Sequence, residues 1–272
     1  MVQKKDRYGN YKKRASRISL RLDKRSEHGP CDIIGDVHGC ADELFELLEK
    51  LGYVNEKGCY THPQGRRAVF LGDLCDRGPR NVDVLRAVMA MVEAKAALCV
   101  VGNHDDKLMR WLMGRNVQLT HGLENTAAEL LRESGDFREK VRGFLSGLVS
   151  HYILDDGKLV VAHAGIKENL QGIDTVWVRK FCLYGEVTGE VDQYGFPIRK
   201  DWANEYRGRA TVVYGHTPGP EPVIKNNTFC IDTACVFGGK LTALRYPELE
   251  LVSVPARRVY SEPPESLAAI MP

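Results

Sequence analysis

The sequence lacks the features that mark secreted and membrane-spanning proteins. None of its apolar runs approaches the roughly 18 residues that a membrane helix needs, and the basic N-terminus is not followed by the hydrophobic segment of a signal peptide. Its eight cysteines form no Cys-x-x-Cys pair, and several lie inside apolar stretches. We therefore expect a cytoplasmic protein without membrane contact, whose cysteines are reduced core residues rather than disulfides or a redox motif.

A strong overall charge is also absent. The formal net charge of +2 over 272 residues argues against a protein that binds polyanions through its whole surface. Residues 1–25 are the exception, with ten Lys or Arg against Asp6 and Asp23. We interpret this basic arm as a solvated leader, with an electrostatic contact to nucleic acid as the alternative. No aromatic signature of an RNA-recognition or OB-type domain accompanies the arm.

The composition predicts a single large core. With 43% hydrophobic residues, the chain is long enough to fold as one catalytic domain with appendages. We expect the basic arm over residues 1–30, the catalytic domain over residues 31–254 and a C-terminal tail over residues 255–272. Because Pro263, Pro264 and Pro272 lie in this tail, we expect a loose terminus.

Three successive segments repeat one plan, in which an apolar strand ends near a glycine, a polar cluster follows, and a helix begins. We expect the strands at 31–34, 68–71 and 97–101, and the helices at 41–51, 82–92 and 107–113. Residues 115–150 predict covering helices, residues 166–209 a lid or substrate-binding insertion, and further strands are expected at 158–162, 210–214, 228–233, 240–246 and 250–254. In an α/β protein the polar clusters beyond such strands converge at one edge.

Six side chains with oxygen or nitrogen donors lie at or just after these strand ends. They are Asp36, His38, Asp73, Asn103, His163 and His216. Asp36 and His38 are two residues apart, so an extended segment directs both to the same side, and mixed oxygen and nitrogen ligands suit Mn, Fe, Zn or Ni. The set fits two cations that share one carboxylate, the arrangement used for in-line displacement at phosphorus. The sequence therefore predicts phosphoryl chemistry.

The same segments carry a family resemblance. Gly35-Asp36-x-His38-Gly39, Gly72-Asp73-x-x-Asp76-Arg77-Gly78, Gly102-Asn103-His104-Asp105, His163-Ala164-Gly165 and Gly215-His216-Thr217 resemble, in order, the motifs of calcineurin-like metallophosphoesterases. The resemblance covers residues 31–254 and implies an α/β fold, an αββα sandwich of two mixed sheets flanked by helices. The Ser/Thr-phosphatase branch usually has Glu where this chain has Asp105, and often Gly where it has Ala164.

The resemblance implies two divalent metal ions as cofactors. One ion would be held by Asp36, His38 and Asp73, and the other by Asp73, Asn103, His163 and His216, so that Asp73 bridges the two. Manganese is favoured, with iron, zinc and nickel as alternatives. A hydroxide between the ions would attack phosphorus, and Asn103 would also contact the substrate phosphate.

Further residues receive roles from the resemblance. His104, oriented by Asp76, would protonate the leaving oxygen, and Arg77 would bind the phosphate with its planar fork. Arg179 would be a second phosphate ligand, and Asp232 would tune the site or orient a metal ligand. The alternatives are a structural neighbour of the metal ligands for His104 and a surface arginine for Arg179.

Four other segments are similar to the phosphatase domain of bacterial polynucleotide kinase-phosphatase, an RNA end-healing enzyme. They are Glu27-His28-Gly29-Pro30, residues 115–122, residues 183–190 and Tyr206-Arg207-Gly208-Arg209. The kinase and nucleotidyltransferase (ligase) modules of that family are not expected in this chain. The similarity implies hydrolysis of phosphomonoesters or 2′,3′-cyclic phosphates at RNA or nucleotide ends, as in RNA repair. The alternatives are a bis(5′-nucleosyl)-tetraphosphatase, a Ser/Thr protein phosphatase, and a non-catalytic binding module that keeps the metal cradle.

Overall fold

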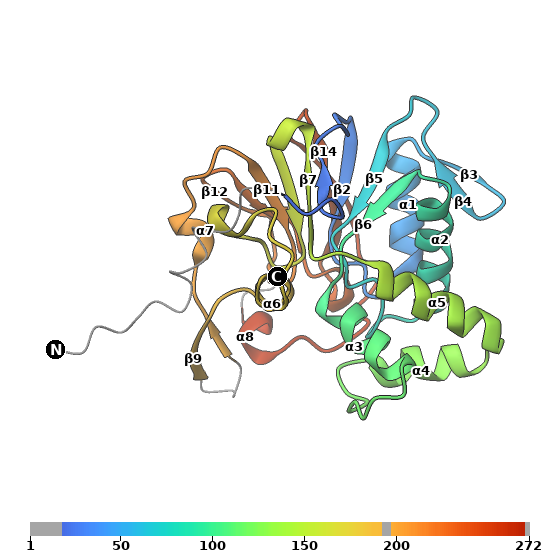
Figure 1. The fold of residues 1–272 in the computed structure, drawn as a ribbon. Helices are drawn as coiled ribbons and strands as arrows, with labels where there is room; N and C mark the ends of the chain where they lie inside the picture. The colour runs from blue at the N-terminus through green and yellow to red at the C-terminus, as the bar shows by residue number, and fades with distance from the viewer. Residues whose placement is uncertain (1–17, 192–196, 270–272) are drawn as a thin grey trace.

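Two β-sheets lie face to face in the computed structural model, with helices on both outer faces (Figure 1). The structure describes residues 18–191 and 197–269. One sheet has five strands in the order β15-β14-β2-β5-β6, and the other has six in the order β1-β7-β8-β11-β13-β12. Each sheet contains parallel and antiparallel neighbours. The predicted sandwich of two mixed sheets is confirmed.

The strands lie close to the segments expected from the sequence. The five-stranded sheet contains β2 (Cys31–Ile34), β5 (Arg67–Phe70), β6 (Ala97–Cys99), β14 (Lys240–Tyr246) and β15 (Glu250–Pro255). The six-stranded sheet contains β1 (Asp23–Lys24), β7 (His151–Leu154), β8 (Leu159–Ala162), β11 (Thr211–Tyr214), β12 (Val223–Lys225) and β13 (Thr228–Cys230). Two hairpins stand apart from these sheets, β3 (Val54–Glu56) with β4 (Cys59–Thr61) and β9 (Val187–Val191) with β10 (Pro197–Arg199).

Successive side chains of each strand point to opposite faces of its sheet. One apolar layer therefore lies between the two sheets, and another lies beneath the helices on each outer face. Ile33 and Val69 point into the layer between the sheets, whereas their neighbours Ile34 and Phe70 belong to the layer beneath the outer helices. All four side chains are fully buried. Because successive residues of a strand face opposite sides, a continuous apolar strand is what a sheet covered on both faces requires.

Helices cover the outer faces of both sheets. The five-stranded sheet is covered by α1 (Ala41–Leu51) and α2 (Asn81–Glu93), and α6 (Val176–Tyr184) and α7 (Trp202–Glu205) pack on the six-stranded sheet. Four leucines of α1 are buried, Leu44, Leu47, Leu48 and Leu51, and the helix ends where Gly52 adopts a left-handed conformation. The remaining helices are α3 (Asn103–Leu112), α4 (Leu123–Leu131), α5 (Gly135–Gly147) and α8 (Glu265–Ala268).

Helix α3 begins earlier than the sequence indicates. We expected its start at Lys107, after a loop that carries Asn103 and His104, but the helix begins at Asn103. The carboxylate of Asp105 accepts a hydrogen bond from the Gly102 backbone N–H at 2.9 Å and caps the helix. Both polar side chains therefore stand on the first turn of a helix, a more rigid support than a loop.

Both ends of the chain differ from the prediction. Part of the segment assigned to the basic arm joins the six-stranded sheet, because β1 pairs with β7, and Leu22 is fully buried. Residues 1–17 lie outside the described residues. At the other end, Tyr260 Oη donates to Glu43 at 2.7 Å and Leu267 is 5% exposed. The expectation of a loose tail is therefore wrong for residues 256–269.

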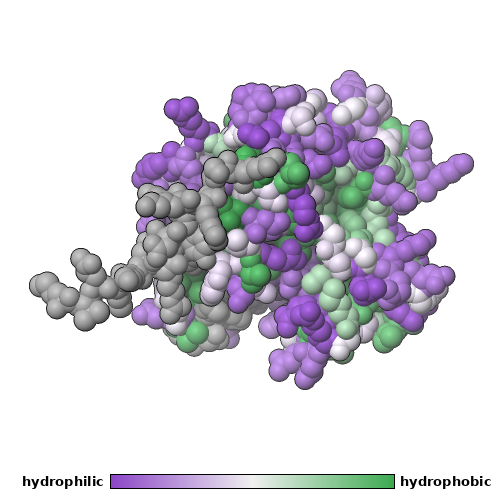
Figure 2. Space-filling view, viewed as in Figure 1, coloured by the Kyte–Doolittle hydropathy of each residue, from purple (hydrophilic) through white to green (hydrophobic). Residues whose placement is uncertain are grey.

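The surface and the cysteines agree with the sequence analysis. The face shown in Figure 2 is mostly hydrophilic, with apolar side chains in small groups. All eight cysteines are free thiols, and seven are buried. Within residues 18–191 and 197–269, no helix has the length and apolar character needed to cross a membrane.

Candidate active site

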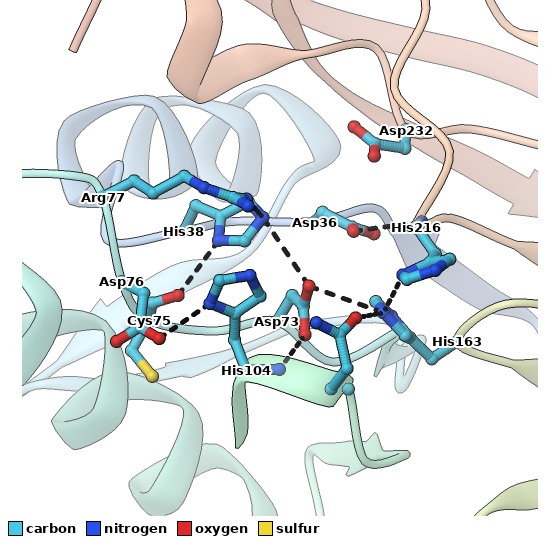
Figure 3. A network of polar contacts seen from close by, with 12 residues as sticks. Asp36, His38, Asp73, Cys75, Asp76, Arg77, His104, His163, His216 and Asp232 are labelled. Carbon is cyan, nitrogen blue, oxygen red and sulfur yellow. Dashed lines mark hydrogen bonds and ion pairs between the residues drawn. The ribbon is translucent and has the colours of Figure 1, made fainter. Parts of the chain in front are cut away.

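The six predicted metal ligands meet at the edge where the parallel strands of both sheets end (Figure 3). Asp36 and His38 follow β2, Asp73 follows β5, and Asn103 opens α3 just after β6. The six-stranded sheet contributes His163 after β8 and His216 after β11. The two sheets therefore supply complementary parts of one cluster, as the repeated strand-loop-helix plan predicted.

The backbone at these loops is unusual. Three of the ligands have a left-handed conformation, with φ of 47° at His38, 48° at Asp73 and 68° at His216. Non-glycine residues adopt this conformation at a cost, and such residues gather at functional sites. The neighbouring Gly215 has no room for a side chain, because a Cβ atom there would lie 2.0 Å from Asp36 Oδ1. The loops are therefore shaped to bring polar side chains together.

His38 presents an unprotonated nitrogen to the centre of the cluster. Its Nδ1 donates to the Cys75 carbonyl at 3.0 Å, which leaves Nε2 as an acceptor. This Nε2 lies 3.6 Å from Asp73 Oδ2 and accepts a hydrogen bond from Arg77 at 2.8 Å. A cationic group thus already contacts the nitrogen that was predicted to bind a metal.

His163 is oriented in the same way. Its Nδ1 donates to the Leu71 carbonyl at 3.0 Å, and its Nε2 lies 2.9 Å from Asn103 Oδ1 and 3.4 Å from Asp73 Oδ2. His216 Nδ1 completes the group at 3.0 Å from the same Nε2. Acceptor atoms that converge without a proton between them repel one another, and a cation in their midst removes that repulsion.

Two orphaned atoms support this interpretation. Among the residues that the structure describes, Asp36 Oδ1 and His216 Nε2 are buried and have no hydrogen-bond partner. Burial, with Asp232 and Asp73 nearby, raises the pKa of Asp36 well above its usual range, and burial raises the pKa of Asp73 to about 8. Buried carboxylates and bare imidazole nitrogens are the ligands that borderline divalent cations take. The residues present therefore fit a metal centre.

His104 belongs to a separate buried chain of hydrogen bonds. Its Nδ1 lies 2.7 Å from Asp76 Oδ2, as the sequence predicted, and the Thr126 hydroxyl donates to Asp76 Oδ1 at 2.6 Å. Burial and the charge of Arg77 lower the pKa of His104 well below its usual value. Burial also raises the pKa of Asp76 to about 6, against the opposing hydrogen bond from Thr126. The carboxylate fixes the ring so that Nε2 faces the cluster.

The other predicted residues divide into two groups. Arg77 and Asp232 line the cavity above the cluster, and the Asp232 carboxylate accepts a hydrogen bond from the Ala234 backbone at 3.1 Å. Arg179 is not among the residues that line this cavity. Its guanidinium donates to Asp106 at 3.1 Å and to the Leu148 carbonyl at 3.2 Å. The structure thus brings Asp232 to the site and leaves Arg179 in an ion pair beside it.

Several residues of the site escaped the sequence analysis. Asp105 binds the backbone N–H groups of Asp73 at 2.8 Å and Leu74 at 3.1 Å, so it holds the loop that carries the predicted bridging ligand. Arg199 and Phe237 line the cavity. The signal for Asp105 was its place in the Gly-Asn-His-Asp motif, whereas nothing in the local pattern marked Arg199 or Phe237.

The cavity combines a polar floor with an apolar wall. Its volume is about 600 Å³. Side chains of the predicted metal ligands form the floor, and the apolar lining includes Ile198, Pro218, Phe237, Pro264 and Leu267. Pockets that combine a few convergent polar groups with apolar walls are typical of small-molecule sites. The cavity is therefore suited to a ligand with both a phosphate and an apolar, planar part.

A sequence model described as calcineurin-like phosphoesterase matches residues 30–252. The chain is 52% identical over 233 residues to the asymmetrical bis(5′-nucleosyl)-tetraphosphatase PrpE of Anoxybacillus flavithermus, covering 84% of this chain and 95% of that protein. It is 50% identical over 235 residues to PrpE of Bacillus subtilis, covering 85% and 96%.

Solved structures agree with these matches. A crystal structure assigned provisionally to a diadenosine tetraphosphatase aligns with a TM-score of 0.61 and 25% identity, covering 86% of this chain and 97% of that chain. A protein serine/threonine phosphatase from Saccharomyces cerevisiae has the same fold, with a TM-score of 0.57, 15% identity, and coverage of 90% and 85%.

Proposed function

The chain belongs to the calcineurin-like phosphoesterase family and is a hydrolase of phosphate esters, and from this premise we propose that it cleaves dinucleoside tetraphosphates asymmetrically. The products are a nucleoside triphosphate and a nucleoside monophosphate. The observation that carries the proposal is the cavity, in which the predicted metal ligands form a floor beside an apolar wall that includes Phe237. Phe237 is buried, and the Arg77 guanidinium lies 5.2 Å from the centre of its ring. The wall therefore offers a nucleoside an apolar contact next to an arginine that can bind phosphate.

The relatives favour this substrate over the main interpretation of the sequence. The proteins that match at 50% identity or more over most of the chain are named bis(5′-nucleosyl)-tetraphosphatase rather than polynucleotide kinase-phosphatase. The prediction of RNA or 2′,3′-cyclic phosphate ends is not supported, and the tetraphosphatase alternative replaces it. The predicted electrostatic contact of the basic arm with nucleic acid involves residues 1–17, which lie outside the described residues.

Two divalent cations are the cofactors in this proposal, with manganese favoured and iron, zinc or nickel as alternatives. The first would be held by Asp36, His38 and Asp73, and the second by Asp73, Asn103, His163 and His216. When bound, the cations supply Lewis-acid polarisation of the phosphoryl group and a lowered pKa for water. Their charge also offsets the cost of burying these carboxylates close to one another, since burial and then the neighbouring carboxylates raise the pKa values of Asp36 and Asp73.

The protein side chains bind the substrate and move the proton. Arg77 binds phosphate oxygens, since its guanidinium already reaches His38 Nε2 at 2.8 Å and has no carboxylate partner in the described part of the chain. His104 gives a proton to the leaving oxygen from Nε2 while Asp76 holds Nδ1. Burial favours the neutral form of His104. The negative charge of the bound substrate favours the protonated form, so His104 takes up its proton when the substrate binds.

A substrate panel tests the proposal. Diadenosine tetraphosphate, a 3′-phosphate RNA oligomer, 2′,3′-cyclic AMP and a phosphoserine peptide are compared at equal concentration with Mn²⁺, and products are separated by chromatography. We expect the tetraphosphate to have the highest kcat/KM and to give ATP and AMP in equal amounts. Two molecules of ADP, or a preference for the RNA or the peptide, would contradict the proposal. The His104→Ala variant is the control for contaminating activity, because its metal content should match that of the wild type.

A further inference from the structure

A second cavity, of about 510 Å³, lies on the other side of Arg77. Arg77 lines both cavities, so this residue lies at the boundary between them. The second cavity is otherwise bounded by α4 and by the C-terminal segment, and its lining includes Arg132, Arg258 and Tyr260. It contains none of the predicted metal ligands. Its lining includes three arginines, whereas the first cavity combines the predicted metal ligands with an apolar wall.

The second cavity has a net positive charge, because its lining contains three arginines and one carboxylate. In the part of the chain that the structure describes, neither Arg132 nor Arg258 forms an ion pair, and both residues are exposed. The Arg258 guanidinium is positioned 5.1 Å from the centre of the Tyr260 ring. The one carboxylate in the lining, Glu129, has its two oxygens occupied by Asn81 Nδ2 at 2.6 Å and the Val82 backbone N–H at 2.9 Å.

The hydrogen bonds around His104 indicate which cavity receives the leaving group. His104 is held by Asp76, and Asp76 is held by Thr126 of α4. The same helix supplies part of the lining of the second cavity. The opposite side of the ring, with Nε2, faces the cluster. The His104 ring lies 4.8 Å from the His38 ring, whose Nε2 accepts a hydrogen bond from Arg77 at 2.8 Å. A group that accepts its proton from His104 therefore lies beside Arg77, the residue that also lines the second cavity. Figure 3 shows Arg77 and Asp76 together on one side of the cluster, with His216 and Asp232 on the other.

We infer that a dinucleoside tetraphosphate lies across Arg77, with its monophosphate half in the apolar cavity and its departing triphosphate half in the cavity lined by Arg132 and Arg258. This inference rests on the proposed function and adds the orientation of the substrate. Water oxygen bonds to the phosphorus of the monophosphate half, the bridging P–O bond to the triphosphate breaks, and His104 protonates the oxygen that leaves. The proton lost by the water passes to solvent, from which His104 is protonated again. Asymmetry of cleavage then follows from the difference between the arginine-lined cavity and the cavity with the apolar wall.

The direction of attack is tested by isotope labelling. Hydrolysis of diadenosine tetraphosphate in H₂¹⁸O should place the label in AMP, because the phosphorus under attack belongs to the monophosphate half. A label found in ATP would overturn the orientation while leaving asymmetrical hydrolysis intact. Absence of hydrolysis, together with turnover of another ester, would instead contradict the proposed function.

The arginine cavity is tested by substitution. Arg132→Ala and Arg258→Ala should each lower kcat/KM for diadenosine tetraphosphate by roughly fivefold, as expected for an exposed ion contact. The loss should be smaller for diadenosine diphosphate, whose leaving group has a single phosphate. Arg142→Ala is the matched control, since Arg142 is a partly exposed arginine of α5 that is paired with Glu139 and lines neither cavity. Equal losses on both substrates, or no loss on the tetraphosphate, would overturn the assignment.

Binding provides a readout that needs no turnover. Inorganic triphosphate is titrated by calorimetry into the protein in the presence of a chelator, because the arginines need no metal to bind an anion. We expect the dissociation constant to rise in the Arg132→Ala/Arg258→Ala double variant and to stay unchanged in Arg142→Ala. The affinity of the wild type should also fall with added salt, since exposed charges are screened. Equal affinity of the double variant and the wild type would refute the cavity as a triphosphate site.

Discussion

Removal of the Thr126 hydroxyl should move the pH dependence of catalysis. The hydroxyl donates to Asp76 Oδ1 at 2.6 Å in a fully buried setting, and Asp76 in turn holds His104 at 2.7 Å. Thr126→Val keeps the shape of the side chain and removes this donor. Because the hydrogen bond favours ionised Asp76, its loss raises the pKa of Asp76 above the present value of about 6.

The size of the change follows from the energy of the bond. A hydrogen bond to a charged group contributes about 1.5–3 kcal/mol, which corresponds to roughly one to two pKa units. The acid limb of the profile of kcat/KM against pH should therefore move to higher pH by about that amount. Activity at pH 6.5 should fall by about tenfold, and activity at pH 8.5 should stay within about twofold of the wild type, since Asp76 is then ionised in both proteins.

The assay is diadenosine tetraphosphate hydrolysis between pH 5.5 and 9, with metal content measured at each pH. Thr228→Val is the matched control, because Thr228 is also fully buried and its hydroxyl donates to the Lys225 carbonyl at 2.8 Å. The control should lose stability without a shift of the acid limb. An acid limb that stays in place in Thr126→Val, with stability lowered as in the control, would refute the proposed link from Thr126 through Asp76 to His104.

The other predictions concern the metal centre and the proton donor. Asp73→Asn should abolish binding of both cations and lower activity by at least about 10³-fold, because one side chain serves both ions. Elemental analysis and turnover measure the two effects, and one ion retained at full occupancy would contradict the prediction. His104→Ala should lower kcat by about 10²–10⁴-fold at unchanged metal content. Gly215→Ala should weaken metal binding by more than about tenfold, because its Cβ atom would lie 2.0 Å from Asp36 Oδ1; unchanged affinity would show that the loop adapts. The folded pKa of Asp73, about 8, lies above its ordinary value of 3.8, so in chelator the stabilisation present at low pH should be lost as pH rises through 8. Urea unfolding should show the free energy of unfolding falling by up to about 1.4 kcal/mol per pH unit between pH 6.5 and 8. A free energy of unfolding that does not change over this range would contradict the prediction.

The convergence of the predicted metal ligands was predictable because their positions follow a local rule. An apolar strand, a glycine and then a polar side chain place Asp36 or Asp73 at a sheet edge whatever the rest of the chain does. Cavity walls obey no such rule. Arg199 lies in a segment without periodicity, and Phe237 lies in a short 3₁₀ turn between two strands, so only the packing of distant segments brings them together.

Two expectations involve partners that lie far away in the chain. The resemblance implied a phosphate contact for Arg179, with a surface arginine as the alternative, and in the structure its guanidinium donates to Asp106; the phosphate role stays a prediction. Prolines suggested a loose tail, yet the described part of that tail is held by Glu43, which lies more than 200 residues earlier in the chain. Partners at such separations leave no trace in the local pattern, and tertiary contacts then override composition.

The pairing of β14 with β2 has a consequence for biosynthesis. Ala243 lies opposite Ile34 at the centre of the five-stranded sheet, so strands about 200 residues apart in the chain are neighbours. At ~5–20 residues per second, β2 and the Asp36 loop wait roughly 10–40 s on the ribosome before their partner is synthesised. During that interval one edge of β2 is unpaired and the apolar faces of Ile33 and Ile34 lack part of their cover. The nascent chain is therefore a natural client for chaperones that bind extended apolar segments, and its metal centre can form only after His216 has emerged.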